Sequence, residues 1–372
     1  MSAGPGFRRT ANPPIERAST VLIERAKDLY NPDVPSYGRG GLAVADDLKA
    51  AFAERCEGAG TSLVSSGLQA CTTALEALTK AGDHVLITDS VYIPTRRFCD
   101  QTLKRFGVET TYYDPRIGAG IAELIRPNTS VVYLESPGSL TLDIQDVPAI
   151  VDAARAKGAT TIIDDTWAAL TYFKPLTLGV DVSVHAATKY PSGGSDVFLG
   201  AIVSRTSDLA KTIATHVRNV GASVSPDDAY AVLRSMHTID ARLAQHQASA
   251  RALADWLAER PEIARVLHPA RPDHPDHALW ARDFTGASGL FSIVLKTAVP
   301  EEAYAFLDAL EVFGLGYSFG GFESLALYCD PQLGPRKGDR TDQGALIRFS
   351  IGLEPVDLLK ADLEKALAAL AR

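Results

Sequence analysis

The chain has 372 residues, of which 46% are hydrophobic and 22% charged, and its formal net charge at pH 7 is −8. This composition is typical of a globular protein with more than one sizeable core, and it excludes a disordered or fibrous chain. The net charge is acidic, and no Lys/Arg cluster is dense enough to follow a phosphate backbone. Nucleic acids and anionic membrane surfaces are therefore not expected as partners.

The cysteines and the first residues bear on the compartment. Cys56, Cys71, Cys99 and Cys329 show no CxxC or metal-ligand spacing, so we expect thiols in a reducing compartment rather than structural zinc or disulfides. The first residues lack the apolar segment of a secretory signal, and no apolar run reaches the roughly eighteen residues of a membrane helix. These features predict a cytoplasmic protein.

Three histidines cluster in the sequence LHPARPDHPDH, at His268, His274 and His277. The prolines between them suit an exposed loop better than the usual ligand spacings of a metal site. We therefore expect no metal in this protein.

The chain divides into three regions of different composition. Residues 1–40 are rich in Pro, Gly and Arg, with one short helical pattern at about 15–29. Such a segment cannot bury much of itself, so we expect an arm that lies against another part of the assembly. Residues 41–234 alternate between strand and helix patterns, and residues 235–372 form a smaller mixed region. The boundary near Ser235 falls within a long helix-compatible stretch.

The middle region has the pattern of repeated βαβ units. Its expected strands are 61–64, 84–88, 110–113, 131–135, 161–164, 182–185 and 199–203, and its expected helices include 68–80, 95–106 and 147–157. This alternation predicts an α/β fold with a large, mostly parallel sheet and helices on both faces. The last region is expected to be α+β, with strands 265–268, 291–295 and 345–351 and helices 300–313 and 356–371.

The turn at residues 65–70 follows a strand and opens a helix, with Gly67 at the turn. Backbone N–H groups and the positive end of the helix dipole meet at such a turn, which makes it a candidate phosphate site. Many strand–helix turns carry glycine for steric reasons alone, so this signal by itself favours a turn without a ligand.

Two carboxylates, Asp164 and Asp165, end an otherwise apolar strand. Ligands bind at the carboxyl ends of parallel strands, and a carboxylate there needs a cationic partner such as a protonated ring nitrogen. A simple helix N-cap is the alternative role for the aspartate.

Lys189 follows the next strand in an apolar context. Loss of hydration lowers the pKa of a lysine and frees the amine needed for a Schiff base, although most lysines are solvated surface groups. Gly67, Asp164 and Lys189 together provide a phosphate turn, a pyridinium partner and a reactive amine, which is the set that pyridoxal phosphate (PLP) requires.

In this order, the motifs resemble the Cys/Met-metabolism enzymes of the fold type I PLP superfamily, which share an aspartate aminotransferase-like fold. The resemblance runs from about Tyr37 to Glu354, nearly the whole chain. It implies a homodimer as the catalytic unit, paired into a tetramer. In residues 36–41, Tyr37 and Arg39 would bind the cofactor phosphate of the neighbouring subunit.

The resemblance also implies roles for individual residues. Gly67 and Leu68 match the backbone phosphate cradle, and Thr188 matches the hydroxyl beside it. Tyr92 matches the tyrosine that stacks on the pyridine ring and assists the catalytic Lys189. The residues that match the site for the substrate carboxylate are Ser318 and Arg348. Two departures stand out, since Ala186 replaces a common phosphate-binding serine and Phe319 replaces a common tryptophan.

Within the family, the sequence is most similar to the cystathionine β-lyases. Residues 93–96 and 135–139 lack the Gly or Cys and the Thr-Asn-Pro that many γ-acting relatives carry. The implied activity is β-elimination of L-cystathionine to homocysteine, pyruvate and ammonia, a step of transsulfuration and methionine biosynthesis, with cysteine desulfhydration as a side activity. The alternatives are a γ-acting enzyme (methionine γ-lyase, cystathionine γ-synthase or an O-acylhomoserine sulfhydrylase) and a non-catalytic protein on the same fold.

Overall fold

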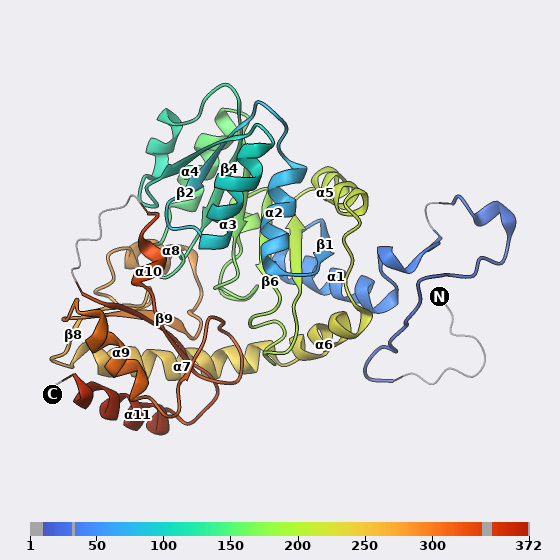
Figure 1. The fold of residues 1–372 in the computed structure, drawn as a ribbon. Helices are drawn as coiled ribbons and strands as arrows, with labels where there is room; N and C mark the ends of the chain where they lie inside the picture. Colours follow the sequence, from blue (N-terminus) through green and yellow to red (C-terminus); the bar gives the residue numbers. More distant parts are fainter. Residues whose placement is uncertain (1–9, 32–33, 337–343, 371–372) are drawn as a thin grey trace.

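The structure, a computed structural model, describes residues 10–31, 34–336 and 344–370. Over these residues the chain forms a seven-stranded sheet in the order β1-β7-β6-β5-β4-β2-β3 and a five-stranded sheet in the order β10-β11-β12-β9-β8. The larger sheet belongs to the first part of the chain and the smaller sheet to the last part (Figure 1).

All seven strands expected in the middle region are confirmed, each to within two residues. They are β1 (Gly60–Val64), β2 (His84–Thr88), β3 (Glu109–Tyr113), β4 (Thr129–Glu135), β5 (Thr160–Asp164), β6 (Val182–Ala186) and β7 (Gly200–Ser204). Five of them, β2 to β6, pair in parallel with one another, whereas β7 is antiparallel to both of its neighbours. The predicted α/β fold with a mostly parallel sheet is confirmed.

Helices cover both faces of this sheet, because alternate strand residues point to opposite sides. In β4, Val131 and Tyr133 join one hydrophobic core and Val132 and Leu134 join another. The first core is covered by α2 (Gly67–Ala77), α3 (Ile93–Arg97), the π-helix η3 (Phe98–Leu103) and α5 (Ser207–Asn219). The opposite face is covered by α1 (Ala43–Cys56), α4 (Val147–Ala156) and α6 (Pro226–Met236). Short 3₁₀ turns η4 (Gly118–Glu123) and η5 (Pro175–Leu178) lie in the connections.

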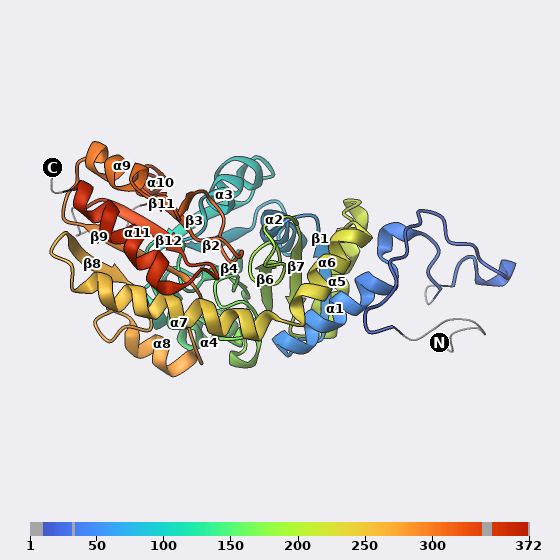
Figure 2. The same cartoon turned by 90° about the horizontal axis from the view of Figure 1, so that it is seen from below.

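The last part of the chain begins with the long helix α7 (Ile239–Ala258), which follows a short break after α6 (Figure 2). Its other elements are β8 (Ile263–Leu267), α8 (His277–Asp283), β9 (Leu290–Leu295), α9 (Pro300–Asp308), β10 (Gly314–Leu315), β11 (Leu325–Tyr328), α10 (Asp330–Leu333), β12 (Leu346–Ser350) and α11 (Val356–Ala369). The expected mixture of helices and strands is confirmed, and the expected end of the last helix at Ala371 lies outside the described residues. No described helix is both long and apolar enough to cross a membrane.

Residues 10–31 and 34–40 form an extended segment that projects away from the two sheets (Figures 1 and 2). The helix expected at 15–29 is wrong, because the segment forms only the 3₁₀ turns η1 (Ala26–Asp28) and η2 (Gly38–Gly40). Isolated helices depend on packing of an apolar face, and Leu22 is 91% exposed. The expected arm also includes residues 1–9 and 32–33, which lie outside the described residues.

The histidine cluster is not the exposed loop that the prolines suggested. His268 and His274 are buried, and each accepts a hydrogen bond on Nδ1 from a backbone N–H two residues later, at Ala270 and Asp276. Each imidazole ring thus satisfies a backbone N–H of its own turn, so this proline-rich segment can be packed inside the molecule.

Candidate active site

Asp164 and Lys189 lie at the carboxyl ends of two neighbouring parallel strands. Asp164 is the last residue of β5, and Lys189 follows β6 by three residues. The aspartate raises the pKa of Lys189 while burial lowers it. The structure therefore brings the two residues that the sequence singled out into one site, at the edge where α/β sheets bind ligands.

The amine of Lys189 points toward the smaller sheet. Its Nζ donates a hydrogen bond to Ser318 Oγ at 2.9 Å and lies 4.9 Å from the centre of the Phe319 ring. Burial, followed by the nearby Arg348 guanidinium, lowers the pKa of Lys189 to about 8. A much larger fraction of this amine than of an exposed lysine is thus uncharged near neutral pH, as a nucleophile requires.

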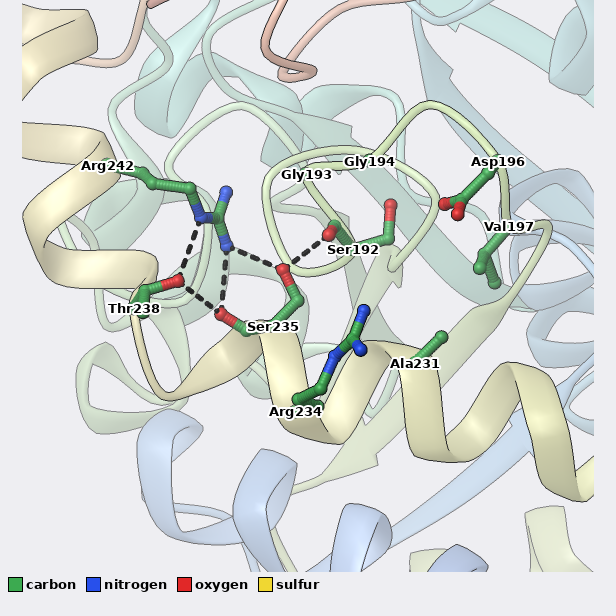
Figure 3. A pocket seen from close by; sticks show the side chains of 10 residues that line it. All are labelled: Ser192, Gly193, Gly194, Asp196, Val197, Ala231, Arg234, Ser235, Thr238 and Arg242. Atoms are coloured by element: carbon green, nitrogen blue, oxygen red, sulfur yellow. Dashed lines mark hydrogen bonds between the residues drawn. The ribbon is translucent and has the colours of Figure 1, made fainter. Parts of the chain in front are cut away.

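Residues at the junction of α6 and α7 hold the turn that follows Lys189 through hydrogen bonds to its backbone. Arg242 Nη1 donates to the Tyr190 carbonyl at 2.8 Å, and the Ser235 hydroxyl donates to the Ser192 carbonyl. A pocket of about 340 Å³ separates this turn from α6, with Arg234 and Arg242 on its wall (Figure 3). These contacts fix the backbone from which Lys189 extends.

Asp164 is held by two donors and has no ion-pair partner among the described lysines and arginines. Its Oδ1 accepts the Thr166 N–H at 3.0 Å, and the Cys71 thiol donates to its Oδ2 at 3.6 Å. Burial raises the pKa of Asp164. A buried carboxyl group without a cation fits the protonated ring nitrogen expected of PLP.

The start of α2 forms a close cradle at the end of β6. A Cβ on Gly67 would lie 2.3 Å from Ala186 Cβ, so only glycine permits this approach. The Ser66 hydroxyl caps the helix by accepting the Gln69 N–H at 3.1 Å. The amides of Gly67 and Leu68, in the first turn, have no intrahelical acceptors. This cradle fits a phosphate group.

Thr188 lies beside the cradle, but its hydroxyl is already engaged. Thr188 Oγ1 accepts the Leu199 N–H at 3.1 Å and donates to the Leu199 carbonyl at 3.3 Å. The remaining lone pair of this hydroxyl oxygen cannot bind a phosphate, because phosphate oxygens need hydrogen-bond donors. Its predicted phosphate contact would therefore require this hydroxyl to release the Leu199 carbonyl.

Arg348 on β12 presents the clearest unmet hydrogen-bonding group of the site. Its Nη2 donates to the carbonyls of Tyr317 and Ser318, both at 3.0 Å, whereas the buried Nε has no partner. Burial lowers the pKa of the guanidinium, which has no carboxylate partner among the described residues. A buried cation of this kind fits a ligand carboxylate, because leaving it unpaired is costly.

Tyr92 precedes α3 with its ring 43% exposed. Burial of the phenol, with nearby thiol and carboxyl groups, raises the pKa of Tyr92. A raised pKa favours the protonated phenol, and the predicted assistance of Tyr92 to Lys189 stays a prediction.

Tyr37 and Arg39 lie in the extended arm, not in the site of their own chain. The Arg39 guanidinium carbon is 5.6 Å from the centre of the Tyr37 ring, which is 52% exposed. In the described part of the chain, no hydrogen bond or ion pair joins either residue to the other predicted site residues. Their predicted role in a neighbouring subunit remains a prediction.

Two site residues were missed from the sequence. Glu135 ends β4 after an apolar run, as Asp164 ends β5, so the same pattern could have found it. Cys71 lies inside α2 with no signal of its own, and only the packing of α2 on the sheet brings it to Asp164.

Known proteins with similar sequences and structures cover nearly the whole chain. The profile of the family described as "Cys/Met metabolism PLP-dependent enzyme" matches residues 4–368. A putative cystathionine β-lyase of Rhizobium johnstonii is 49% identical, with 96% of this chain and 91% of that protein aligned. Cystathionine beta-lyase MetC of Escherichia coli is 43% identical, with 96% and 94% aligned. A crystal structure of cystathionine gamma synthase from Xanthomonas oryzae superposes with a TM-score of 0.90 at 30% identity, covering 97% of this chain and 93% of that one.

Proposed function

Because the chain belongs to the Cys/Met metabolism PLP-dependent enzyme family, we propose that it is a carbon–sulfur lyase that acts on L-cystathionine. The β-elimination breaks the bond between sulfur and the β-carbon, consumes one water, and releases homocysteine, pyruvate and ammonia. The observation that carries this proposal is the placement of the Lys189 amine between the buried Asp164 carboxyl and the buried guanidinium of Arg348. Relatives at 40–49% identity are named cystathionine β-lyase or putative cystathionine β-lyase.

Bound PLP supplies an aldehyde that links to amines and a ring that accepts an electron pair from the substrate α-carbon. Lys189 would hold this group and then, once the substrate amine has replaced it, take the proton from the α-carbon. Asp164 would keep a proton on the ring nitrogen. Arg348 would pair with the α-carboxylate through its unpartnered Nε–H and so orient the C–H bond toward Lys189.

The remaining site residues would bind and align the same groups. Gly67 and Leu68 would donate backbone N–H groups to the phosphate at the start of α2. Ser318 would hold the Lys189 amine, with which it shares a hydrogen bond at 2.9 Å. Tyr92 would stack on the pyridine ring. The hydroxyl of Thr188 would reorient to reach the phosphate.

The arm supports a proposal about assembly. An exposed segment that carries Tyr37 and Arg39 suits a second copy of the chain, where the Arg39 guanidinium would add a cation to the backbone N–H groups of the cradle around Gly67. We propose a homodimer as the catalytic unit, pairing into a cytoplasmic homotetramer. Within each chain, the arm (1–40) would precede a cofactor-binding domain (41–234) and a C-terminal domain (235–372).

The rival assignment is a γ-acting enzyme on the same scaffold, and the solved γ-synthase at 30% identity keeps it in consideration. The two reactions give different keto acids. Incubation with L-cystathionine, L-cysteine and L-methionine, followed by identification of each keto acid, therefore discriminates them. We expect pyruvate from the first two substrates and no 2-oxobutyrate. 2-Oxobutyrate as the main product would show that the enzyme catalyses γ-elimination and not β-elimination.

The Lys189→Ala variant tests whether the site is the catalytic one. We expect loss of the visible absorbance of bound cofactor and a fall in turnover of at least about a thousandfold, since the removed amine both holds the cofactor and moves the proton. Lys157→Ala, at an exposed position after α4, is the matched control and should behave as the wild type. Retained turnover with a wild-type spectrum in Lys189→Ala would exclude this site.

A further inference from the structure

Glu135 is a buried carboxylic acid that the proposed chemistry does not use. It is the last residue of β4 and pairs in register with Asp164, the last residue of β5. Its side chain is 8% exposed and forms no ion pair with a described lysine or arginine. A second buried carboxyl beside Asp164 is costly unless hydrogen bonds compensate for its loss of hydration.

The carboxyl of Glu135 holds the backbone of Tyr92. Glu135 Oε2 accepts the Tyr92 N–H at 2.6 Å. Tyr92 is the N-cap residue of α3, and its own side chain caps no N–H of that helix. The Tyr92 carbonyl accepts the N–H groups of Thr95 and Arg96, at 3.0 and 3.1 Å. Glu135 therefore fixes the residue from which α3 starts.

The Glu135 backbone is itself held firmly. Its N–H donates to Gln145 Oε1 at 3.2 Å, and the Gln145 N–H donates to the Ser136 hydroxyl at 3.0 Å. Burial and the neighbouring Asp164 raise the pKa of Glu135 well above its usual range. Glutamine keeps an acceptor oxygen on a side chain of the same length and adds no negative charge beside Asp164, so Glu135→Gln is the conservative variant.

We propose that Glu135 is a positioning residue that fixes Tyr92, and through it the phenol ring, over the pyridine ring of the cofactor. This inference rests on the proposed function, because it requires that PLP binds between Tyr92 and Asp164. Glu135 acts from the end of β4, one strand away from the β2–α3 connection that carries Tyr92. The sheet order, and not the chain order, creates the contact.

The test measures the dissociation constant of PLP for cofactor-depleted protein, together with the visible circular dichroism of the bound cofactor. Glu135→Ala should weaken PLP binding about five- to thirtyfold, the range expected for the loss of one buried hydrogen bond near a ligand. Glu135→Gln keeps an acceptor oxygen and should stay within about twofold of the wild type. Glu135→Asp withdraws the carboxyl by about 1.5 Å and should resemble the alanine variant.

The decisive comparison repeats Glu135→Ala in a Tyr92→Ala background. If Glu135 acts through Tyr92, the second substitution should weaken PLP binding less than about twofold in that background. An equal loss in both backgrounds, or a loss in Glu135→Gln equal to that in Glu135→Ala, would overturn the proposal. If Glu135→Ala fails to fold, Glu135→Asp and Glu135→Gln carry the comparison. Failure of the wild type to bind PLP would instead refute the proposed function.

Discussion

Lys189 lies among groups with opposite effects on its protonation. Burial and the Arg348 guanidinium lower its pKa, and Asp164 raises it. The depressing effects prevail, because the amine is largely withdrawn from water and its hydrogen-bond partner, Ser318, is neutral. The reactivity of this lysine is therefore a property of the folded protein before any cofactor binds.

In cofactor-depleted protein, acylation of Lys189 should rise with pH through a midpoint near the pKa of about 8. Removing the positive charge in Arg348→Met should move the Lys189 midpoint upward by roughly one unit, since a like charge disfavours the protonated amine. Mass spectrometry of the labelled peptides measures both midpoints. A midpoint above 10 for Lys189 in the wild type would contradict the environment described.

Sequence reasoning predicted Asp164 and Lys189 because Asp164 ends one apolar strand and Lys189 closely follows the next, a pattern that is visible without a structure. It missed the contact of Cys71 with Asp164 and that of Glu135 with Tyr92. Both depend on which strands and helices become neighbours, and a local pattern does not specify that order.

At the scale of elements, the start of α2 packs tightly against the end of β6 in the candidate site. Gly67 begins the helix and faces Ala186 at the end of the strand, with no room for a side chain. The missing Cβ lets the positive end of α2 reach the sheet edge beside Lys189. Gly67 thus has a specific packing role here, although many strand–helix turns carry glycine for local reasons alone.

Gly67→Ala should lower the free energy of unfolding by about 1–3 kcal/mol, because the new methyl group overlaps Ala186. It should also weaken PLP binding at least about tenfold by moving α2 away from the phosphate. Gly334→Ala is the control, since its Cβ meets nothing within 4 Å. Urea denaturation and PLP titration measure the two effects, and equal stability of both variants would contradict the packing argument.

The elements were predicted best where local pattern and tertiary context agree. The strands between residues 60 and 204 are short, apolar and bounded by turns, so their positions were confirmed. The expected helix 95–106 is divided into α3 and the π-helix η3, and the expected helix 300–313 ends at Asp308. Strands β10 and β11 were missed, because two and four residues are too short for a recognisable period.

At the scale of the whole molecule, the candidate site lies between the two sheets. The larger sheet supplies Lys189 and Asp164, and the smaller sheet with its loops supplies Arg348 and Ser318. A continuous hydrophobic core joins the two sheets, and Trp167 Nε1 donates to the Leu290 carbonyl at 3.0 Å across the junction. The arm, in contrast, is attached by a few exposed contacts such as that of Arg17 with Asp227 at 2.9 Å.

The proposed dimer predicts complementation between two defective chains. Lys189→Ala alone should be inactive, and Arg39→Ala should bind PLP about ten- to hundredfold more weakly, the loss expected for a charge-assisted phosphate contact. In a mixed dimer, one site has both an intact Lys189 and an intact arm, so an equal mixture should regain about a quarter of the wild-type activity. Activity is measured at limiting PLP after subunit exchange. Exchange without recovery would contradict an arm that completes the neighbouring site.

The position of β1 at the edge of the sheet has a consequence for synthesis of the protein. Its only sheet neighbour is β7, and Gly60 pairs with Ser204. At ordinary translation rates of about 5–20 residues per second, the ribosome needs roughly 7–30 seconds to add the intervening residues. Throughout that interval the nascent β1 has no sheet partner in its own chain. The segment that leads into the phosphate cradle is therefore made early and paired late, and until then it is a strand with unpaired edges.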